Sequence, residues 1–226
     1  MPETSFAGWL RGLPVKPEGA AVTLFDGQAK ARQDVHAAVL DIDTGRRDLQ
    51  QCADAVMRLR AEWLYAQRRY GDIGFNFTSG KRVAFARYAK GERPDSSGAT
   101  WRGRAKPDRS YGAFRRYMDL IFAYAGTASL AKELKPAQAG DIRIGDVFIK
   151  GGFPGHAVLV ADMAESESTG EKRFLLVQSY MPAQDIHVLK NPADASGSPW
   201  YAIPERSLVT PEWTFAAGSL MRWPQD

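Results

Sequence analysis

Residues 145–180 contain three short apolar segments that decide the fold: Gly145-Asp146-Val147-Phe148-Ile149, Gly155-His156-Ala157-Val158-Leu159-Val160 and Phe174-Leu175-Leu176-Val177-Gln178-Ser179-Tyr180. Glycine, proline or a turn rich in serine and glutamate separates them, which is typical of consecutive antiparallel strands. Two polar residues interrupt the segments, His156 at the start of the second and Gln178 near the end of the third. A histidine and an amide on neighbouring strands can form two parts of a catalytic site whose nucleophile is a cysteine.

The chain has one cysteine, Cys52, which excludes an internal disulfide and a multi-cysteine zinc site. Residues 48–65 predict a helix that begins at Asp48 as N-cap. Its apolar residues recur at intervals of three and four, while Arg58, Arg60 and Glu62 lie mostly elsewhere. The apolar stripe consists of Leu49, Cys52, Val56, Leu59 and Trp63.

Cys52 therefore falls in the first turns of this helix. The positive end of the helix dipole favours a thiolate there and lowers its pKa. The alternative is a buried structural cysteine on the apolar stripe. His156 and Gln178 have similar alternatives, as a hydrogen-bonded turn residue and as a buried amide.

The composition, with 44% hydrophobic and 25% charged residues, is that of a globular protein, and we expect a single domain over residues 1–226. The longest apolar runs fall short of a membrane span. A net charge of +4 favours encounter with acidic polymers, but no nucleic-acid module is recognisable. Residues 1–5 lack the features of a secretory signal, so we expect either a cytoplasmic protein or an exported one whose signal was removed.

Residues 78–134 are interpreted as an inserted lobe of helices and loops. Within it, Trp101 is flanked by Arg102 and Arg104 and is a candidate for binding an anionic or sugar-containing ligand. A solvated loop anchored by its tryptophan is the alternative. Further helices are expected over residues 5–13, 111–124 and 127–134, and further strands over 22–25, 35–42, 73–77, 185–189, 200–203, 213–215 and 220–223.

Three segments resemble the signature segments of a bacterial family catalogued as a domain of unknown function, and together they span most of the chain. They are residues 45–55, 153–158 and 178–187. Members of that family often look exported or lipid-anchored. The resemblance therefore implies the cell envelope or periplasm as the location, provided that an export signal was removed.

The order of the parts also resembles the papain-like NlpC/P60 and CHAP cell-wall hydrolases. In those families a cysteine begins a helix, a Gly-Asp pair opens the first strand, a histidine opens the second, and a polar residue on the third orients that histidine. Cys52, Asp146, His156 and Gln178 occur in this order here. The resemblance implies an α+β fold, with an antiparallel sheet packed on the helix that carries the cysteine.

We therefore expect Cys52, His156 and Gln178 to be catalytic, in a cysteine-dependent amidase or peptidase that forms an acyl-enzyme on peptidoglycan peptides. Substrate-binding residues are expected at Gln51, Trp101, Arg102, Ser179 and Tyr180. The expected partner is peptidoglycan or another anionic cell-wall polymer. No metal site is expected, because the three histidines show no ligand spacing. No cofactor and no nucleic-acid partner are expected either.

Two other functions remain open on the sequence. One is a non-catalytic binding domain of the cell envelope, with Cys52 buried and the arginines near Trp101 in contact with a glycan. The other is a Cys-His enzyme that cleaves lipid esters or transfers acyl groups on the same scaffold.

Overall fold

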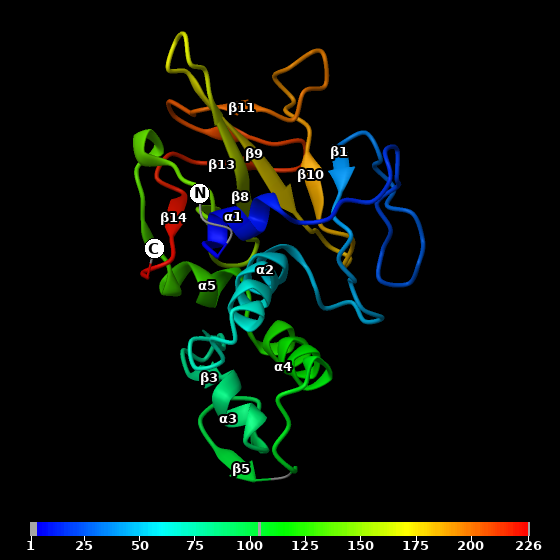
Figure 1. Cartoon of the computed structure of the whole chain (residues 1–226), viewed down its shortest axis with the longest axis vertical. Coiled ribbons are helices and arrows are strands. Elements are labelled where there is room, and N and C mark those ends of the chain that lie inside the picture. Colours follow the sequence, from blue (N-terminus) through cyan, green and yellow to red (C-terminus); the bar gives the residue numbers. More distant parts are fainter. Residues whose placement is uncertain (1–3, 104, 226) are drawn as a thin grey trace.

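The computed structural model describes residues 4–103 and 105–225. Its largest sheet has eight antiparallel strands and lies in the upper half of Figure 1. In order across the sheet the strands are β1 (His36–Val39), β10 (His187–Leu189), β9 (Lys172–Gln178), β8 (His156–Glu165), β7 (Val147–Lys150), β14 (Leu220–Arg222) and β6 (Lys135–Pro136), and β11 (Tyr201–Ala202) pairs with β9. The three antiparallel strands predicted over residues 145–180 are thus confirmed and lie side by side as β7, β8 and β9.

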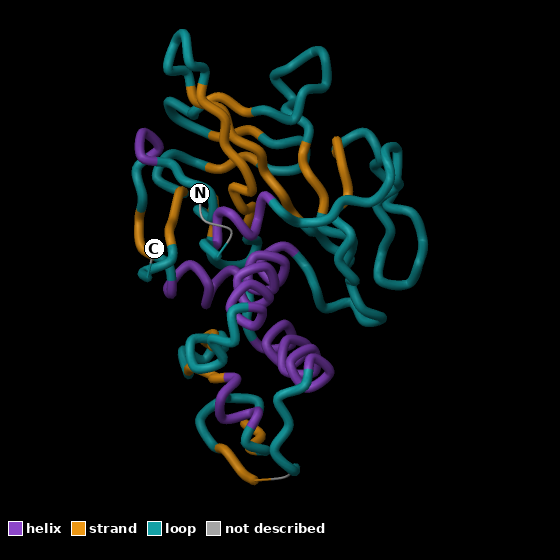
Figure 2. The backbone as a smooth tube through the Cα atoms, viewed as in Figure 1, coloured by secondary structure: helices purple, strands orange, loops and turns teal. Residues whose placement is uncertain are grey.

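Most of the helices lie below this sheet in Figure 2, which establishes the α+β class. They are α1 (Phe6–Arg11), α2 (Cys52–Ala66), α3 (Phe85–Ala89), α4 (Tyr111–Tyr124) and α5 (Thr127–Glu133), with a 3-10 turn at Ala139–Asp141. Three small hairpins are separate from the sheet: β2 (Gly74–Asn76) with β3 (Arg82–Ala84), β4 (Glu92–Pro94) with β5 (Trp101–Gly103), and β12 (Leu208–Val209) with β13 (Thr214–Phe215).

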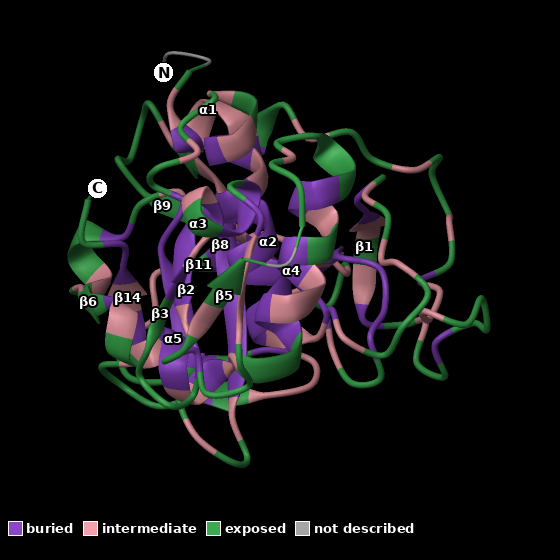
Figure 3. Ribbon diagram, turned by 90° about the horizontal axis from the view of Figure 1, so that it is seen from below, coloured by how far each residue is buried: buried purple, intermediate pink, exposed green. Residues whose placement is uncertain are grey.

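Helix α2 is the central helix of the core and is buried on nearly all sides, as Figure 3 shows together with β8. It contacts β8 and β9 of the sheet and also α4 and α5. The expectation that Arg58 and Arg60 lie away from the buried face was wrong, because both side chains are buried, that of Arg60 against the rings of Phe6 and Trp223. Arg58 is compensated by Glu62 Oε1 at 2.6 Å and Gln50 Oε1 at 2.8 Å.

The start of α2 also differs from the prediction. The N-cap is Gln51 and not Asp48, so Cys52 is the first helical residue. The backbone N–H of Gln51 donates to Asp54 Oδ2 at 3.1 Å, which fixes the first turn. Asp48 instead accepts from the Ala183 N–H at 2.7 Å and thereby ties the segment before the helix to the loop after β9.

Two predicted strands are shorter than expected. Residues 35–42 contribute only the four residues of β1, since its partner β10 has only three residues with which to pair. Residues 22–25 form isolated bridges, from Thr23 to Ala29 and from Leu24 to Gln184, because the chain turns back at once.

The segment 78–134 shares the core of the sheet half. Phe114, Tyr117 and Ile121 of α4 belong to the same buried cluster as Leu59 of α2 and Leu159 of β8. Hairpin β4–β5 and α3 lie at the lower end of Figure 1, away from the sheet. That this segment is an insertion within the domain stays a prediction.

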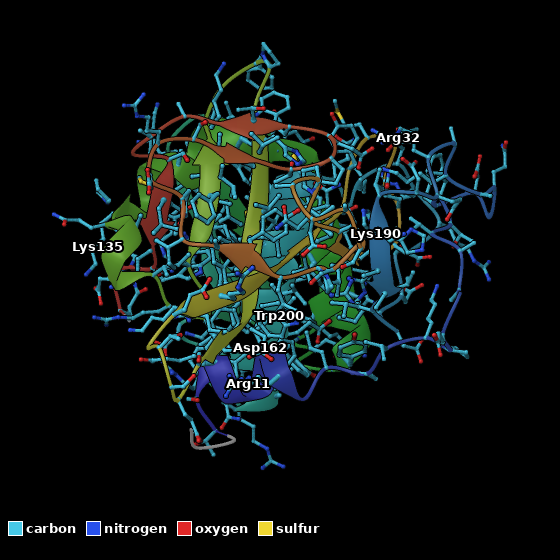
Figure 4. All side chains as sticks on the ribbon, turned by 90° about the horizontal axis from the view of Figure 1, so that it is seen from above. Arg11, Arg32, Lys135, Asp162, Lys190 and Trp200 are labelled. Atoms are coloured by element: carbon cyan, nitrogen blue, oxygen red, sulfur yellow. The ribbon has the colours of Figure 1, made fainter. Side chains whose placement is uncertain are left out.

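Two ion pairs fix the elements around β7 and β8. Arg11 of α1 pairs with Asp162 of β8, and both are labelled side by side in Figure 4. Asp146, from the Gly-Asp pair before β7, is almost fully buried and accepts from Arg222 of β14 at 2.7 and 2.8 Å. The Gly-Asp pair thus has a structural explanation, because the carboxylate of Asp146 joins β14 to β7.

Candidate active site

A pocket of about 250 Å³ lies where the start of α2 meets the start of β8 and the end of β9, and both Cys52 and His156 line it. The β7–β8 loop contributes Phe153 and the loop after β9 contributes Met181. Another cavity, of about 430 Å³, is lined by Arg60 and Trp223 and by neither the cysteine nor a histidine. The predicted nucleophile and the predicted base therefore share one cavity, although 104 residues separate them in the sequence.

The sulfur of Cys52 lies against the strand that carries the histidine. Backbone N–H groups of Ala53 in α2 and Ala157 in β8 are close enough to it to favour the thiolate. Burial outweighs them and, together with the negative charge of Asp54, raises the pKa of the Cys52 thiol to about 11. At neutral pH the thiol is protonated, which corrects the expectation that the helix start lowers its pKa.

His156 lies in an aromatic enclosure at the first position of β8. Its ring centroid is 5.0 Å from that of Tyr180, 5.3 Å from that of Trp213 and 5.8 Å from that of Phe215. Burial lowers the pKa of the imidazole to about 4, against smaller opposing effects of Gln178 and Glu212. His156 is therefore neutral at pH 7, as a general base must be.

The loop before His156 requires a glycine at position 155. A Cβ there would lie 2.3 Å from Thr127 Oγ1 and 2.4 Å from the Gly152 carbonyl oxygen. The same Thr127 hydroxyl donates to the Gly152 carbonyl at 3.0 Å. Because Gly155 has no side chain, the loop packs directly on the start of α5 and sets where β8 begins.

Gln178 fixes which nitrogen of His156 carries the proton. Its amide nitrogen lies 2.7 Å from Glu212 Oε2 and 3.3 Å from His187 Nε2. His187 Nδ1 lies 2.9 Å from the Asp185 carbonyl and must donate to it, so its Nε2 accepts. Both amide hydrogens of Gln178 are thus used, and Oε1 faces His156 Nε2 at 2.9 Å. His156 therefore donates through Nε2 and carries its lone pair on Nδ1.

A buried ion pair holds this amide in place. Lys30 Nζ lies 2.7 and 2.8 Å from the two oxygens of Glu212 and 2.9 Å from Gln184 Oε1. The two charged side chains are only 6% and 10% exposed. Sequence reasoning missed both residues. The only signal was the position of Glu212 directly before an apolar segment, which is not specific.

Of the predicted substrate-binding residues, Gln51 and Tyr180 line the pocket. Ser179 does not, because its side chain is fully buried and its hydroxyl lies 2.9 Å from the Gln50 carbonyl and 2.8 Å from the Gln184 carbonyl. Ser179 thus joins the end of β9 to the segment that precedes Cys52.

Trp101 and Arg102 are not brought to this pocket. Both belong to β5 at the far end of the lobe in Figure 1, and the guanidinium carbon of Arg87 lies 4.3 Å from the Trp101 ring centroid. Arg102 lines a separate small cavity with Arg93. Arg104 lies outside the described residues. The surroundings of Trp101 are those of a loop anchored by its tryptophan.

The site as it stands holds a neutral thiol and a neutral imidazole that line the same pocket. Within residues 4–103 and 105–225, no hydrogen bond joins Cys52 Sγ to His156, and no three His, Cys, Asp or Glu side chains are grouped closely enough to hold a metal ion. In that same part of the chain, no helix has the length and apolarity needed to cross a membrane.

Comparison with protein families matches residues 1–222 to the family described as Domain of unknown function (4846). Because the match spans nearly the whole chain, the protein belongs to this family. Comparison with curated proteins found no match, and neither did comparison with solved structures.

Proposed function

We propose that this member of Domain of unknown function (4846) is a cysteine-dependent amide hydrolase, with Cys52 as nucleophile, His156 as base and Gln178 as the residue that orients the base. One observation carries the proposal. The 2.9 Å contact of Gln178 Oε1 with His156 Nε2 leaves the Nδ1 lone pair available, in the same pocket as the only cysteine.

In the acylation step, His156 Nδ1 takes the proton of the Cys52 thiol as the sulfur attacks the substrate carbonyl carbon. The C–S bond forms and the carbonyl oxygen becomes an oxyanion. When the oxyanion collapses, the C–N bond breaks and the imidazolium returns its proton to the leaving amine. The product is a thioester on Cys52.

In the deacylation step, a water molecule loses a proton to His156 Nδ1 and attacks the thioester. The C–S bond breaks, the carboxylic acid leaves, and the proton returns to the sulfur. Backbone N–H groups at the start of α2 and the Gln51 side chain are the candidates for stabilising the oxyanion. Gln178 keeps its bond to Nε2 through both steps and supports the transient positive charge.

The pKa values support proton transfer during attack rather than a preformed ion pair. With the thiol pKa at about 11 and the imidazole pKa at about 4, the neutral pair is the resting state over most of the pH scale. The base is ready at pH 7, and the thiol is deprotonated only as the C–S bond forms.

A papain-like relationship to the NlpC/P60 and CHAP hydrolases is part of this proposal. Its support is the order of parts: the cysteine opens α2, and the histidine and the amide lie on neighbouring strands β8 and β9. Peptidoglycan peptides as substrate follow from that relationship alone. The cell envelope as location follows from the resemblance to a family whose members often look exported or lipid-anchored.

An anionic polymer as partner has separate support in the charge distribution. Residues 78–134 contain twelve Lys and Arg but only five Asp and Glu, a net charge of +7, so the rest of the chain carries −3. A lobe with this charge attracts a polyanion to the molecule.

One observation favours the non-catalytic alternative, a binding domain of the cell envelope. The raised pKa of Cys52 is also what a structural cysteine would show. The exposed Phe153 beside the pocket favours the other alternative, cleavage of lipid esters or acyl transfer. Both alternatives are separated from the proposal by measuring turnover.

The test is hydrolysis of peptidoglycan fragments and of a panel of small amides and thioesters. We expect activity in the wild type and a loss of at least about a thousandfold in Cys52→Ala and in His156→Gln. Gln178→Leu should retain partial activity, because it removes orientation and not the base. Turnover that is equal in wild type and Cys52→Ala would overturn the proposal, and so would the absence of turnover on the whole panel.

A further inference from the structure

The mouth of the Cys52 pocket is unusually apolar. Among the large hydrophobic residues of the described chain, Phe153 and Met181 are the most exposed, at 87% and 62%. They come from different loops, one before β8 and one after β9, and both line this pocket. Exposed apolar side chains that converge on one cavity mark a binding surface.

The charge of the pocket disfavours ligands that carry a negative charge. The described residues that line it include no lysine or arginine, although the chain as a whole is basic. Its acidic lining residues are Asp48 and Asp54. A carboxylate or phosphate on the bound group would find no counter-ion here and would lie near these acidic residues.

Two buried polar atoms of the lining residues lack a protein partner: Asp54 Oδ1, an acceptor, and Trp213 Nε1, a donor. Asp54 is 6% exposed. Buried polar atoms are normally hydrogen-bonded, and these two lack the partner that a ligand bound in the pocket could supply. An amide offers what each requires, an N–H for the carboxyl oxygen and a carbonyl for the indole.

We infer that this pocket selects an uncharged amide whose acyl group is apolar, with the acyl chain lying on Phe153 and Met181 and the amide facing Asp54 and Trp213. This substrate class rests on the proposed function. It differs from the anionic polymer that the lobe attracts, because the group that enters the pocket carries no negative charge.

The test measures equilibrium binding to Cys52→Ala, which cannot form the thioester. The probes are N-acyl glycinamides with acetyl, butanoyl, hexanoyl and octanoyl chains, and an octanoyl analogue that ends in a carboxylate. We expect affinity to rise up to about fourfold for each methylene until the pocket is filled. The carboxylate analogue should bind at least about tenfold more weakly than its neutral counterpart.

Two variants of Cys52→Ala separate the apolar contribution from the polar one. Phe153→Ala should reduce the increase of affinity with acyl chain length and leave the affinity for the acetyl probe unchanged. Trp213→Phe should weaken every probe by about fivefold and leave the dependence unchanged, because it removes one hydrogen bond. Val209→Ala, at an exposed valine away from the pocket, is the control and should change neither.

Equal affinities for acetyl and octanoyl probes, or preference for the carboxylate analogue, would overturn the inference while leaving the hydrolase proposal standing. Chain-length-dependent binding in Cys52→Ala without turnover by the wild type would overturn the hydrolase proposal and leave the binding class standing. The two failures are therefore distinguishable.

Discussion

The pocket of Cys52 and the lobe of residues 78–134 hold their charges in opposite ways. Beside the pocket, Lys30 and Glu212 are buried, paired and hydrogen-bonded to amides. On the lobe, ion pairs such as Arg116 with Asp108 lie on the surface, and basic residues outnumber acidic ones. Buried charges fix the orientation of Gln178 and His156, whereas exposed charges act at long range and are screened by salt.

This difference separates two functions that the net charge of the whole chain does not distinguish. The basic character of the chain belongs to the lobe, so it provides no cation for the pocket that holds the thiol. Attraction of a polyanion and recognition of the reacting group are therefore assigned to different surfaces, and each can be changed by itself.

The largest effect on stability is expected from breaking the buried pair. Glu212→Gln leaves Lys30 buried without a counter-charge and should lower the free energy of unfolding by about 3–5 kcal/mol. Urea denaturation measures this. Asp108→Asn breaks an exposed pair of the lobe and should leave the unfolding midpoint unchanged within error. Equal losses in the two variants would contradict the comparison.

We expect acid to destabilise the folded chain first through His156 in the pocket. His156 has a pKa of about 4 in the folded chain, below its ordinary value near 6.5. The unfolded chain therefore binds more protons between these values, so stability falls as pH drops from about 6.5 to 4. The loss is on the order of 3 kcal/mol, and His187, whose pKa burial lowers to about 3, adds to it. Asp54 opposes this trend, since burial raises its pKa.

Chemical denaturation at pH 7 and pH 4.5 measures the acid effect. His156→Gln should show a shallower loss than the wild type, because the substituted residue does not titrate. An identical pH dependence in both proteins would show that the imidazole is not desolvated.

The reactivity of Cys52 tests the resting state directly. Its alkylation by iodoacetamide should rise with a midpoint near pH 11, above the ordinary thiol value of about 8.5. Asp54→Asn removes a nearby negative charge and should move the midpoint down. A midpoint below 8 would indicate a preformed thiolate and refute the neutral pair.

The smallest effect on turnover is expected from the lobe. Replacing the exposed Arg87, Lys90 and Arg109 by alanine should weaken binding to an anionic polysaccharide and reduce the salt dependence of that binding. Turnover of a small neutral amide should change less than twofold, because none of the three lines the pocket. A parallel loss of turnover would show that the two surfaces are coupled.

The sequence predicted well what depends on local pattern. The periodicity of residues 48–65 and the three β-prone segments from Gly145 onward predicted α2, β7, β8 and β9, and the strand order placed His156 near Gln178. The helix predicted over residues 111–124 is also present as α4, and the Ser110 hydroxyl caps it by accepting from the Ala113 N–H at 3.2 Å. These features are encoded within a few neighbouring residues.

What the sequence did not predict depends on distant contacts. Nothing near Arg58 signals that Tyr111 of α4 would lie over it, and nothing near Arg60 signals that it would pack on Phe6 and Trp223. The thiol pKa was predicted in the wrong direction, because burial between α2 and β8 exceeds the effect of the helix start. Trp101 and Arg102 were grouped with the site by composition, and the fold directs their hairpin away from it.

The pair of Lys30 and Glu212 also has a consequence for synthesis of the chain. Its partners are 182 positions apart, so the chain must be made as far as Glu212 before the ammonium of Lys30 meets its carboxylate. Until then Gln178 lacks the acceptor that orients it, and His156 has no fixed tautomer. A ribosome-bound chain that already contains the cysteine, the histidine and the amide is therefore not yet an organised active site. The chemistry is therefore withheld until Glu212 has been made.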